Sequence, residues 1–69
     1  MKKSHKWTGV EVEFLRRELG MTQQELAYKV GCAMMNVSRW ERGLHKPNRW
    51  MCRELDRLAR RIGFFEGRP

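Results

Sequence analysis

The chain has 69 residues, enough for one small domain with one modest core, and its 41% hydrophobic and 33% charged residues are typical of a globular protein. Its formal net charge of +7 at pH 7 favours a polyanionic partner, for which nucleic acid is the default and an acidic membrane surface the rival. No apolar run approaches the roughly 20 residues of a membrane-spanning helix, and no apolar stretch follows the lysines at positions 2, 3 and 6 as in a signal peptide. We therefore expect a cytoplasmic protein.

The residue types that carry catalysis or metal binding form no recognisable pattern in this sequence. Cys32 and Cys52 are not a C-x-x-C pair, and together with His5 and His45 they match no known zinc-ligand spacing, so we interpret both cysteines as small apolar fillers. The sequence also lacks paired carboxylates in a cleft-like context, a nucleophile with a base, and a glycine-rich phosphate loop. We expect no metal, no cofactor and no enzymatic activity in this single domain of residues 1–69.

Residues 1–8 are predicted to form a basic tail. Such a tail is either disordered or an arm that reaches DNA phosphate or the minor groove. Trp7 can pack down as the residue before a helix cap, in the manner of a hydrophobic staple.

The first helix is predicted over residues 9–19. Thr8 and Glu11 have the spacing of a capping box at its start, and Gly20 is a stop signal at its end. The core stripe of this helix is Val12, Leu15 and Leu19. A second apolar stripe, which either lies under the C-terminal segment or forms a protein contact, is Val10 and Phe14.

The stretch from Thr22 to Gly43 predicts two short helices joined by a tight turn. The first covers residues 22–30, starting with a capping box of Thr22 and Glu25, and the second covers residues 33–42. The inward-facing residues at helical spacing are Leu26, Ala27 and Val30 in the first and Ala33, Val37 and Trp40 in the second. This is the helix-turn-helix pattern, in which the second helix lies in the major groove of DNA.

The residues TQQELAYKVG…VSRWERG in this stretch resemble the lambda-repressor-like (Xre/Cro) helix-turn-helix regulators. The motif of that family has a Thr-Gln-x-Glu-Leu-Ala opening, a Gly in the turn and a Glu-x-Gly ending, and the resemblance extends from Val12 to Pro47. It implies a compact all-α fold of four short helices, with a fold of five helices as the alternative. It also implies double-stranded DNA as the partner.

The resemblance implies which residues read bases. Arg39 stands at a base-reading position, where its guanidinium can fork onto guanine, and Asn36 reads adenine or touches phosphate. Met34 and Met35 stand where the family often has polar residues, and they either contact thymine methyl groups or fill a core gap. The complete base-reading set is Met34, Met35, Asn36, Ser38 and Arg39.

A second set of residues is expected at the DNA backbone: Thr22, Gln23, Arg42, His45, Lys46, Asn48 and Arg49. Gln23 lies at a helix N-terminus, where amide and free N–H groups suit a phosphate, unless its side chain packs within the domain. Arg16 stands where the family has an arginine that pairs with the Glu of Glu-x-Gly, here Glu41. This ion pair would tie the first helix to the recognition helix.

The last helix is predicted over residues 48–62, after a loop that Pro47 stiffens. One face is apolar, with Met51, Cys52, Leu55, Leu58, Ala59 and Ile62, and the opposite face is basic, with Arg49, Arg53, Arg57, Arg60 and Arg61. The basic face is either simply solvated or meets phosphate, a corepressor or an acidic partner. Trp50 lies on the basic side, and the tail of residues 63–69 carries Phe64 and Phe65, which either cover the second stripe of the first helix or form a dimer contact.

These patterns predict a sequence-specific DNA-binding transcriptional regulator that represses and that reads the major groove with residues 33–42. The alternative is an antitoxin-like or adaptor module that binds a toxin-like or regulatory protein through the same fold. A single recognition helix reads only a few base pairs. We therefore expect a homodimer on a pseudo-palindromic site, formed through the C-terminal segment.

Overall fold

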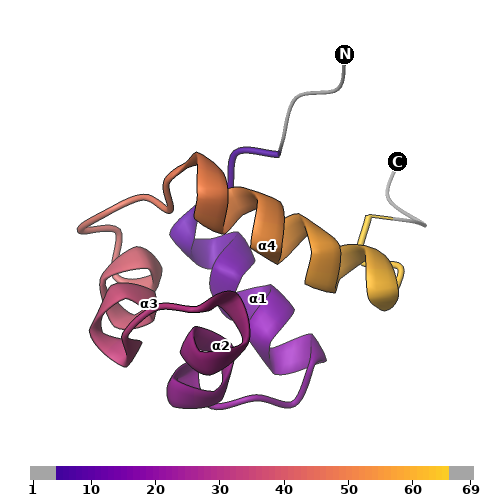
Figure 1. The fold of residues 1–69 in the computed structure, drawn as a ribbon, viewed down its shortest axis with the longest axis horizontal. Coiled ribbons are helices and arrows are strands. Elements are labelled where there is room, and N and C mark those ends of the chain that lie inside the picture. Colours follow the sequence, from indigo (N-terminus) through magenta and orange to yellow (C-terminus); the bar gives the residue numbers. More distant parts are fainter. Residues whose placement is uncertain (1–4, 66–69) are drawn as a thin grey trace.

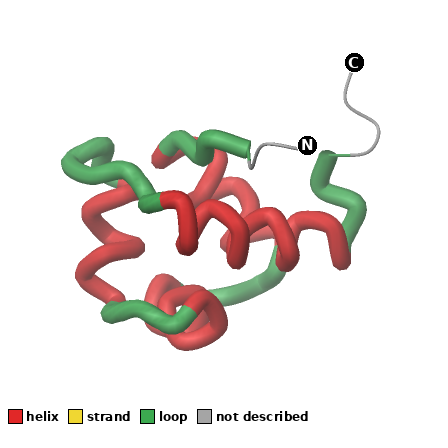
Figure 2. Tube along the Cα trace, turned by 45° about the horizontal axis from the view of Figure 1, so that its top comes forward, coloured by secondary structure: helices red, strands yellow, loops and turns green. Residues whose placement is uncertain are grey.

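The structure, a computed structural model, describes residues 5–65 and consists of four helices joined by short loops (Figure 1). The helices are α1 (Gly9–Glu18), α2 (Gln23–Val30), α3 (Met34–Glu41) and α4 (Arg49–Arg61). Helices and loops make up this whole part of the chain (Figure 2), which confirms the all-α fold class. Within residues 5–65 the optional fifth helix is not present, because residues 62–65 form turns after α4.

Side-chain caps determine where three of the helices begin. Thr8 and Thr22 each accept a hydrogen bond from the N–H of the glutamate three positions on, and that glutamate accepts the N–H of the threonine, so both capping boxes are complete. Asn48 Oδ1 accepts the N–H of Met51 at 2.8 Å at the start of α4. Helix α3 begins after Ala33 without a side-chain cap, so tertiary packing must hold it in place.

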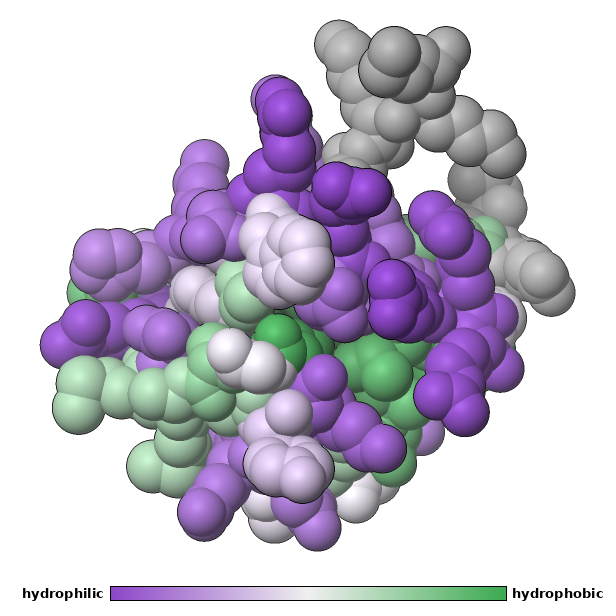
Figure 3. All heavy atoms as spheres, in the orientation of Figure 1, coloured by the Kyte–Doolittle hydropathy of each residue, from purple (hydrophilic) through white to green (hydrophobic). Residues whose placement is uncertain are grey.

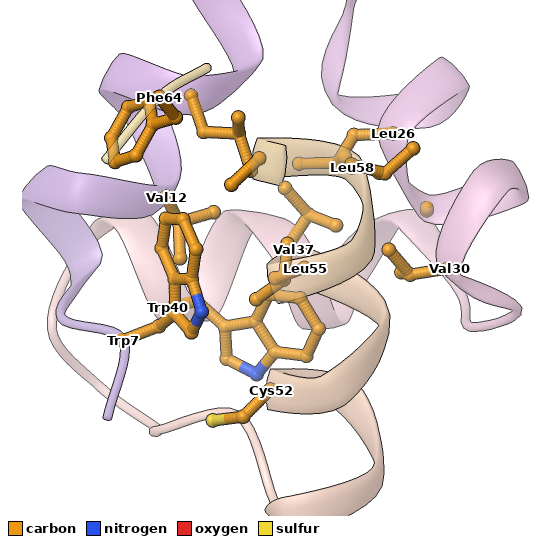
Figure 4. Packing of buried hydrophobic residues seen from close by; sticks show 13 residues of the cluster. Trp7, Val12, Leu26, Val30, Val37, Trp40, Cys52, Leu55, Leu58 and Phe64 are labelled. Carbon is orange, nitrogen blue, oxygen red and sulfur yellow. The ribbon is translucent and has the colours of Figure 1, made fainter. Parts of the chain in front are cut away.

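One hydrophobic core joins all four helices (Figure 4). Each helix contributes a side chain that is 0% exposed, namely Leu15 from α1, Leu26 from α2, Val37 from α3 and Leu55 from α4. Full burial of one such side chain contributes about 1.5–3 kcal/mol. Packing between the helices therefore stabilises the fold more than the intrinsic stability of these short helices does.

The start of α1 packs directly against the end of α3. A Cβ atom built on Gly9 would lie 2.1 Å from the carbonyl oxygen of Trp40, a distance that no real pair of atoms adopts. Because the obstructing atom belongs to the backbone, it cannot swing aside as a flexible side chain would. Glycine at position 9 thus sets the close approach of α1 to the end of the helix-turn-helix unit.

The segments that flank the helices pack together in an aromatic cluster of Trp7, Phe14, Phe64, Phe65 and His5. Trp7 is 2% exposed, its ring lies 5.3 Å from that of Phe64, and Phe64 lies 5.8 Å from Phe14. The expectation of a basic tail through residue 8 therefore needs correction at Trp7, which joins the core, and at His5, which packs beside it, whereas Lys6 is exposed; the lysines at positions 2 and 3 lie outside the described residues. Phe64 folds back onto Phe14 and is not spare surface for a dimer.

Helix α4 departs from its expected apolar face at two positions. Ile62 is 42% exposed, because α4 ends at Arg61 and the chain leaves the helical path there. Asp56 is 4% exposed and lies on the buried side, between residues of the core.

Candidate nucleic-acid interface

The outward face of α3 carries the residues expected to read bases. Met34 and Met35 are 49% and 56% exposed, Asn36 is exposed, and Ser38 and Arg39 are partly exposed. The opposite face of the helix is buried through Val37 and Trp40. In Figure 3 pale green hydrophobic side chains gather at the lower left, over the region of α3 in Figure 1.

The exposure of Met34 and Met35 excludes one of the two roles that the sequence left open, that of filling a gap in the core. Side chains that are about half exposed do not fill a gap in the core. Their thioethers and methyl groups are flexible and apolar, which suits contact with thymine methyl groups at the floor of the major groove.

The residues expected at the DNA backbone lie on loops and helix starts around α3. Arg42, His45, Lys46 and Arg49 are exposed, as are Thr22 and Asn48. The last two already act as helix caps, because the Thr22 hydroxyl accepts the N–H of Glu25 and Asn48 Oδ1 accepts the N–H of Met51. Each keeps a donor group for a phosphate oxygen, the Thr22 hydroxyl hydrogen and the Asn48 amide NH₂.

Arg16 and Glu41 form an ion pair that connects α1 to the end of α3. Arg16 Nε donates to Glu41 Oε2 at 2.6 Å and its Nη2 donates to Glu41 Oε1 at 3.1 Å, which is the bidentate geometry of a strong pair. A third bond, from Arg16 Nη1 to the carbonyl of Met21 at 3.1 Å, fixes the turn between α1 and α2. The side chains are only 17% and 7% exposed.

The electrostatics of this pair follow from its hydrogen bonds. The bond to Glu41 raises the pKa of the Arg16 guanidinium above its ordinary value, although partial burial acts in the opposite direction. The arginine therefore stays charged at every pH at which the protein is folded. Such a pair holds geometry rigidly, because removing one partner leaves the other charge poorly solvated.

Gln23 joins the same network. Its Nε2 donates to Glu41 Oε1 at 3.0 Å, so the first residue of α2 is tied to the end of α3. One of its two amide hydrogens is used in this bond, and the other is left for an external acceptor. The structure thus contains the contact within the domain that the sequence analysis gave as the alternative to phosphate binding.

A family model described as a helix-turn-helix domain matches residues 8–66. The chain belongs to the helix-turn-helix domain family. No curated protein and no solved structure matches the chain. The family match agrees with the resemblance to lambda-repressor-like regulators. Helix-turn-helix domains are DNA-binding modules, and α3 is the second helix of the motif in this chain.

Asp56 is the residue near the helix-turn-helix domain's core that the sequence analysis missed. Its Oδ1 accepts the indole N–H of Trp7 at 2.8 Å and its Oδ2 accepts the backbone N–H of His5 at 3.2 Å, which ties the N-terminal segment to α4. A signal was available, because Asp56 follows Cys52 by four positions and precedes Ala59 by three, both on the buried face. A charged residue at such spacing predicts a buried hydrogen-bonded group.

The part of the chain that the structure describes holds neither a metal-ligand cluster nor a membrane-spanning helix. No group of three or more His, Cys, Asp or Glu side chains there is arranged to hold a metal ion. The described helices are also too short or too polar to cross a membrane. Cys52 is buried, and its Sγ donates a hydrogen bond to the carbonyl of Pro47 at 3.5 Å. Burial raises the pKa of the Cys32 thiol, although a hydrogen bond with Asn36 acts in the opposite direction.

Proposed function

We propose that this helix-turn-helix protein is a sequence-specific transcriptional regulator that binds double-stranded DNA through α3. The observation that carries the proposal is the division of α3 into two faces. One face is anchored in the core and by the bonds of Glu41 to Arg16 and Gln23, and the other presents side chains that suit base edges. A rigid helix with a mixed polar and apolar outer face is what direct readout of a major groove requires.

Base contacts would divide between polar and apolar side chains. The Arg39 guanidinium would donate two hydrogen bonds to guanine O6 and N7, and Asn36 would pair with adenine or contact a phosphate. Met34 and Met35 would favour thymine through its methyl group. Occupancy of the groove by this domain would exclude other proteins from the same site, so we assign it the role of a repressor in the cytoplasm.

The proposal predicts that specificity depends on Arg39. A duplex selected by the wild-type protein from a random library serves as the cognate site, and gel shifts over a range of salt concentrations measure binding. Arg39→Ala should cost about 1–3 kcal/mol on this duplex and relax the preference at one base pair. Gln23→Ala should weaken binding to selected and random duplexes alike, because it removes a contact that carries no sequence information.

The matched control is Arg17→Ala, which removes an exposed arginine of α1 whose partner is Glu13. It should leave the ratio between selected and random duplexes unchanged. If Arg39→Ala behaves like Arg17→Ala, α3 is not in the groove. If the wild-type protein shows no preference for any duplex, the antitoxin-like or adaptor function becomes the better account of this fold.

We further propose that two copies bind a pseudo-palindromic site with half-sites about one helical turn apart. The contact would have to use the exposed apolar side chains Val10, Phe14 and Trp50, since Phe64 is buried against Trp7 and Phe14. Such a patch is small, so the free protein should be monomeric and pair only on DNA. Sedimentation of the complex on one and on two half-sites tests this: equal, independent binding to both half-sites would contradict it.

A further inference from the structure

The exposed face of α4 carries a row of five arginines. Only the first of them, Arg49, is among the residues expected at the DNA backbone around α3. Positions 49, 53, 57, 60 and 61 are all arginine and all exposed. At helical spacing they fall within about 120° of one another around the helix axis. Successive members at four-residue spacing are about 6 Å apart along that axis and about 40° apart around it, so the row winds along one side of the helix.

Acidic residues do little to neutralise this ridge. Asp56 is buried, and its carboxylate oxygens accept hydrogen bonds from Trp7 and His5 and form no ion pair with an arginine of the described residues. Glu54 approaches Arg57 with its carboxylate oxygen 3.8 Å from the guanidinium, a long contact. Arg53 and Arg60 make no ion pair with any described residue. Like charges at this spacing repel one another and destabilise a helix, so a bound polyanion would relieve a strain that the free domain carries.

The ridge lies on a different helix from the base-reading residues, and only Arg49 also belongs to the residues expected at the DNA backbone. Helix α4 runs across the upper part of the molecule in Figure 1, above α3 and α2. Helices α3 and α4 both bury their apolar sides in the one core. In Figure 3 purple hydrophilic side chains crowd the upper edge of the molecule, where α4 runs in Figure 1.

We propose that this arginine ridge is a second nucleic-acid surface, which binds the phosphate backbone of a duplex without reading its sequence. Guanidinium groups fork onto phosphate oxygens, and a linear row of them matches a linear row of phosphates better than a compact acidic patch on a protein. Neutralised phosphates release counterions, which supplies affinity independent of sequence. The inference goes beyond the proposed function, because it holds whether or not α3 reads the major groove.

Salt dependence of binding to a random-sequence duplex tests the ridge. Arg53→Gln with Arg60→Gln removes two unpaired charges from its centre, and each lost phosphate contact should lower the slope of log K against log salt by about 0.9. The charge-matched control is Arg17→Gln with Lys29→Gln, two exposed cations on α1 and α2. The ridge variant should lose close to two units of slope and the control much less; equal slopes for the two variants would overturn the proposal.

The same measurement separates this proposal from that for α3. Arg39→Ala should relax the sequence preference. It should leave unchanged the part of the slope of log K against log salt that the ridge contributes. The ridge variant should weaken binding to selected and random duplexes by the same factor. Loss of preference in the ridge variant, with an unchanged slope, would contradict the assignment of a sequence-independent surface.

Trp50 provides a direct reporter, because it lies beside the ridge and is 60% exposed, whereas Trp7 and Trp40 are buried. A duplex with a single half-site, on which the proposed dimer does not form, should protect the exposed tryptophan from quenching by acrylamide, and poly-glutamate at the same charge concentration should not. Trp50→Phe should abolish the quenchable component and so identifies the signal. Protection by poly-glutamate without protection by DNA would overturn the proposal in favour of an acidic protein partner.

Discussion

Two carboxylates, Glu41 and Asp56, each join segments that are distant in the sequence, but they do so with different partners. Glu41 accepts hydrogen bonds from the charged guanidinium of Arg16 and from the amide of Gln23. Asp56 accepts them from two neutral donors, the indole of Trp7 and the backbone N–H of His5. The first carboxylate holds the recognition helix, and the second holds the N-terminal segment against α4.

The difference shows how position and partner together determine what a buried carboxylate does. At Glu41 the opposite charge and the fork geometry fix the orientation of α3, which any base-reading role needs. At Asp56 the neutral donors satisfy the carboxylate, and the aromatic cluster around Trp7 shields it from solvent. Removing each carboxylate should therefore destabilise the fold for a different reason. Without Glu41 the charge of Arg16 is unpaired, and without Asp56 the N–H groups of Trp7 and His5 are unpaired.

The largest effect is expected from Glu41→Ala. This variant leaves the Arg16 guanidinium, which is 17% exposed, without its partner, and a half-broken buried pair costs about 3–5 kcal/mol. Urea titration measures the loss, with Glu25→Ala as the control because Glu25 is an exposed capping residue. Replacing both Arg16 and Glu41 by Met should recover much of the stability. Equal urea midpoints for Glu41→Ala and Glu25→Ala would count against this role of the pair.

A smaller effect is expected from Asp56→Ala. The variant leaves the Trp7 indole N–H and the His5 backbone N–H without an acceptor, at a cost of about 1–3 kcal/mol. Asp56→Asn keeps a carbonyl oxygen for the indole and should recover part of that cost. The control is Glu54→Ala on the same helix, and urea titration with near-ultraviolet circular dichroism gives the readout. If Asp56→Ala is no less stable than Glu54→Ala, Asp56 does not hold the N-terminal segment.

The smallest effect is expected from Glu11, a third carboxylate, which joins the N-terminal segment to α1. Unlike the effects of Glu41 and Asp56, its contribution to stability should depend on pH. Burial alone would raise the pKa of Glu11, but hydrogen bonds from Thr8 and His5, together with the charge of His5, outweigh it and lower the pKa below the ordinary value of 4.5. A carboxylate with a lowered folded pKa stabilises the protein above its unfolded pKa. This contribution is lost as the pH falls through the folded pKa.

Glu11→Gln should therefore lower the melting temperature at neutral pH, and the gap from wild type should close as the pH falls below about 4.5. Glutamine can still complete the capping box, so the change isolates the charge. Glu25→Gln is the matched change in the other capping box, where among described residues the carboxylate bonds only Thr22. A gap that stays constant with pH would contradict the lowered pKa of Glu11.

The sequence predicted those features of the fold that depend on neighbouring residues. The helices that begin after Thr8 and Thr22 follow from capping boxes between residues three positions apart, and Gly31 ends α2 with a positive φ of 83° that favours glycine. The helix-turn-helix pattern of residues 22–43 likewise rests on spacing within two short helices. For α4 the apolar spacing predicted a buried face, but the end of the helix removed Ile62 from it.

The candidate site was predicted less completely, because its details depend on where side chains point. Spacing alone placed Met34, Met35 and Arg39 on the outer face of α3, and it left open whether the methionines fill the core. The structure exposes them because Val37 and Trp40 already occupy the inner face. Gln23 was expected either at a phosphate or packed within the domain, and its amide donates to Glu41, 18 residues further along the chain, while its phosphate contact stays a prediction.

The sequence by itself determined the all-α class, the helix-turn-helix motif and the basic character of the surface, since caps, periodicity and charge are local or additive properties. Only the tertiary structure decided that Trp7 bonds Asp56, 49 residues away, and that Phe64 folds back onto Phe14. Such choices depend on which buried donor finds which acceptor once four short helices pack around one core. No local pattern contains that information, because the competing partners are separated along the chain and meet only when the chain is folded.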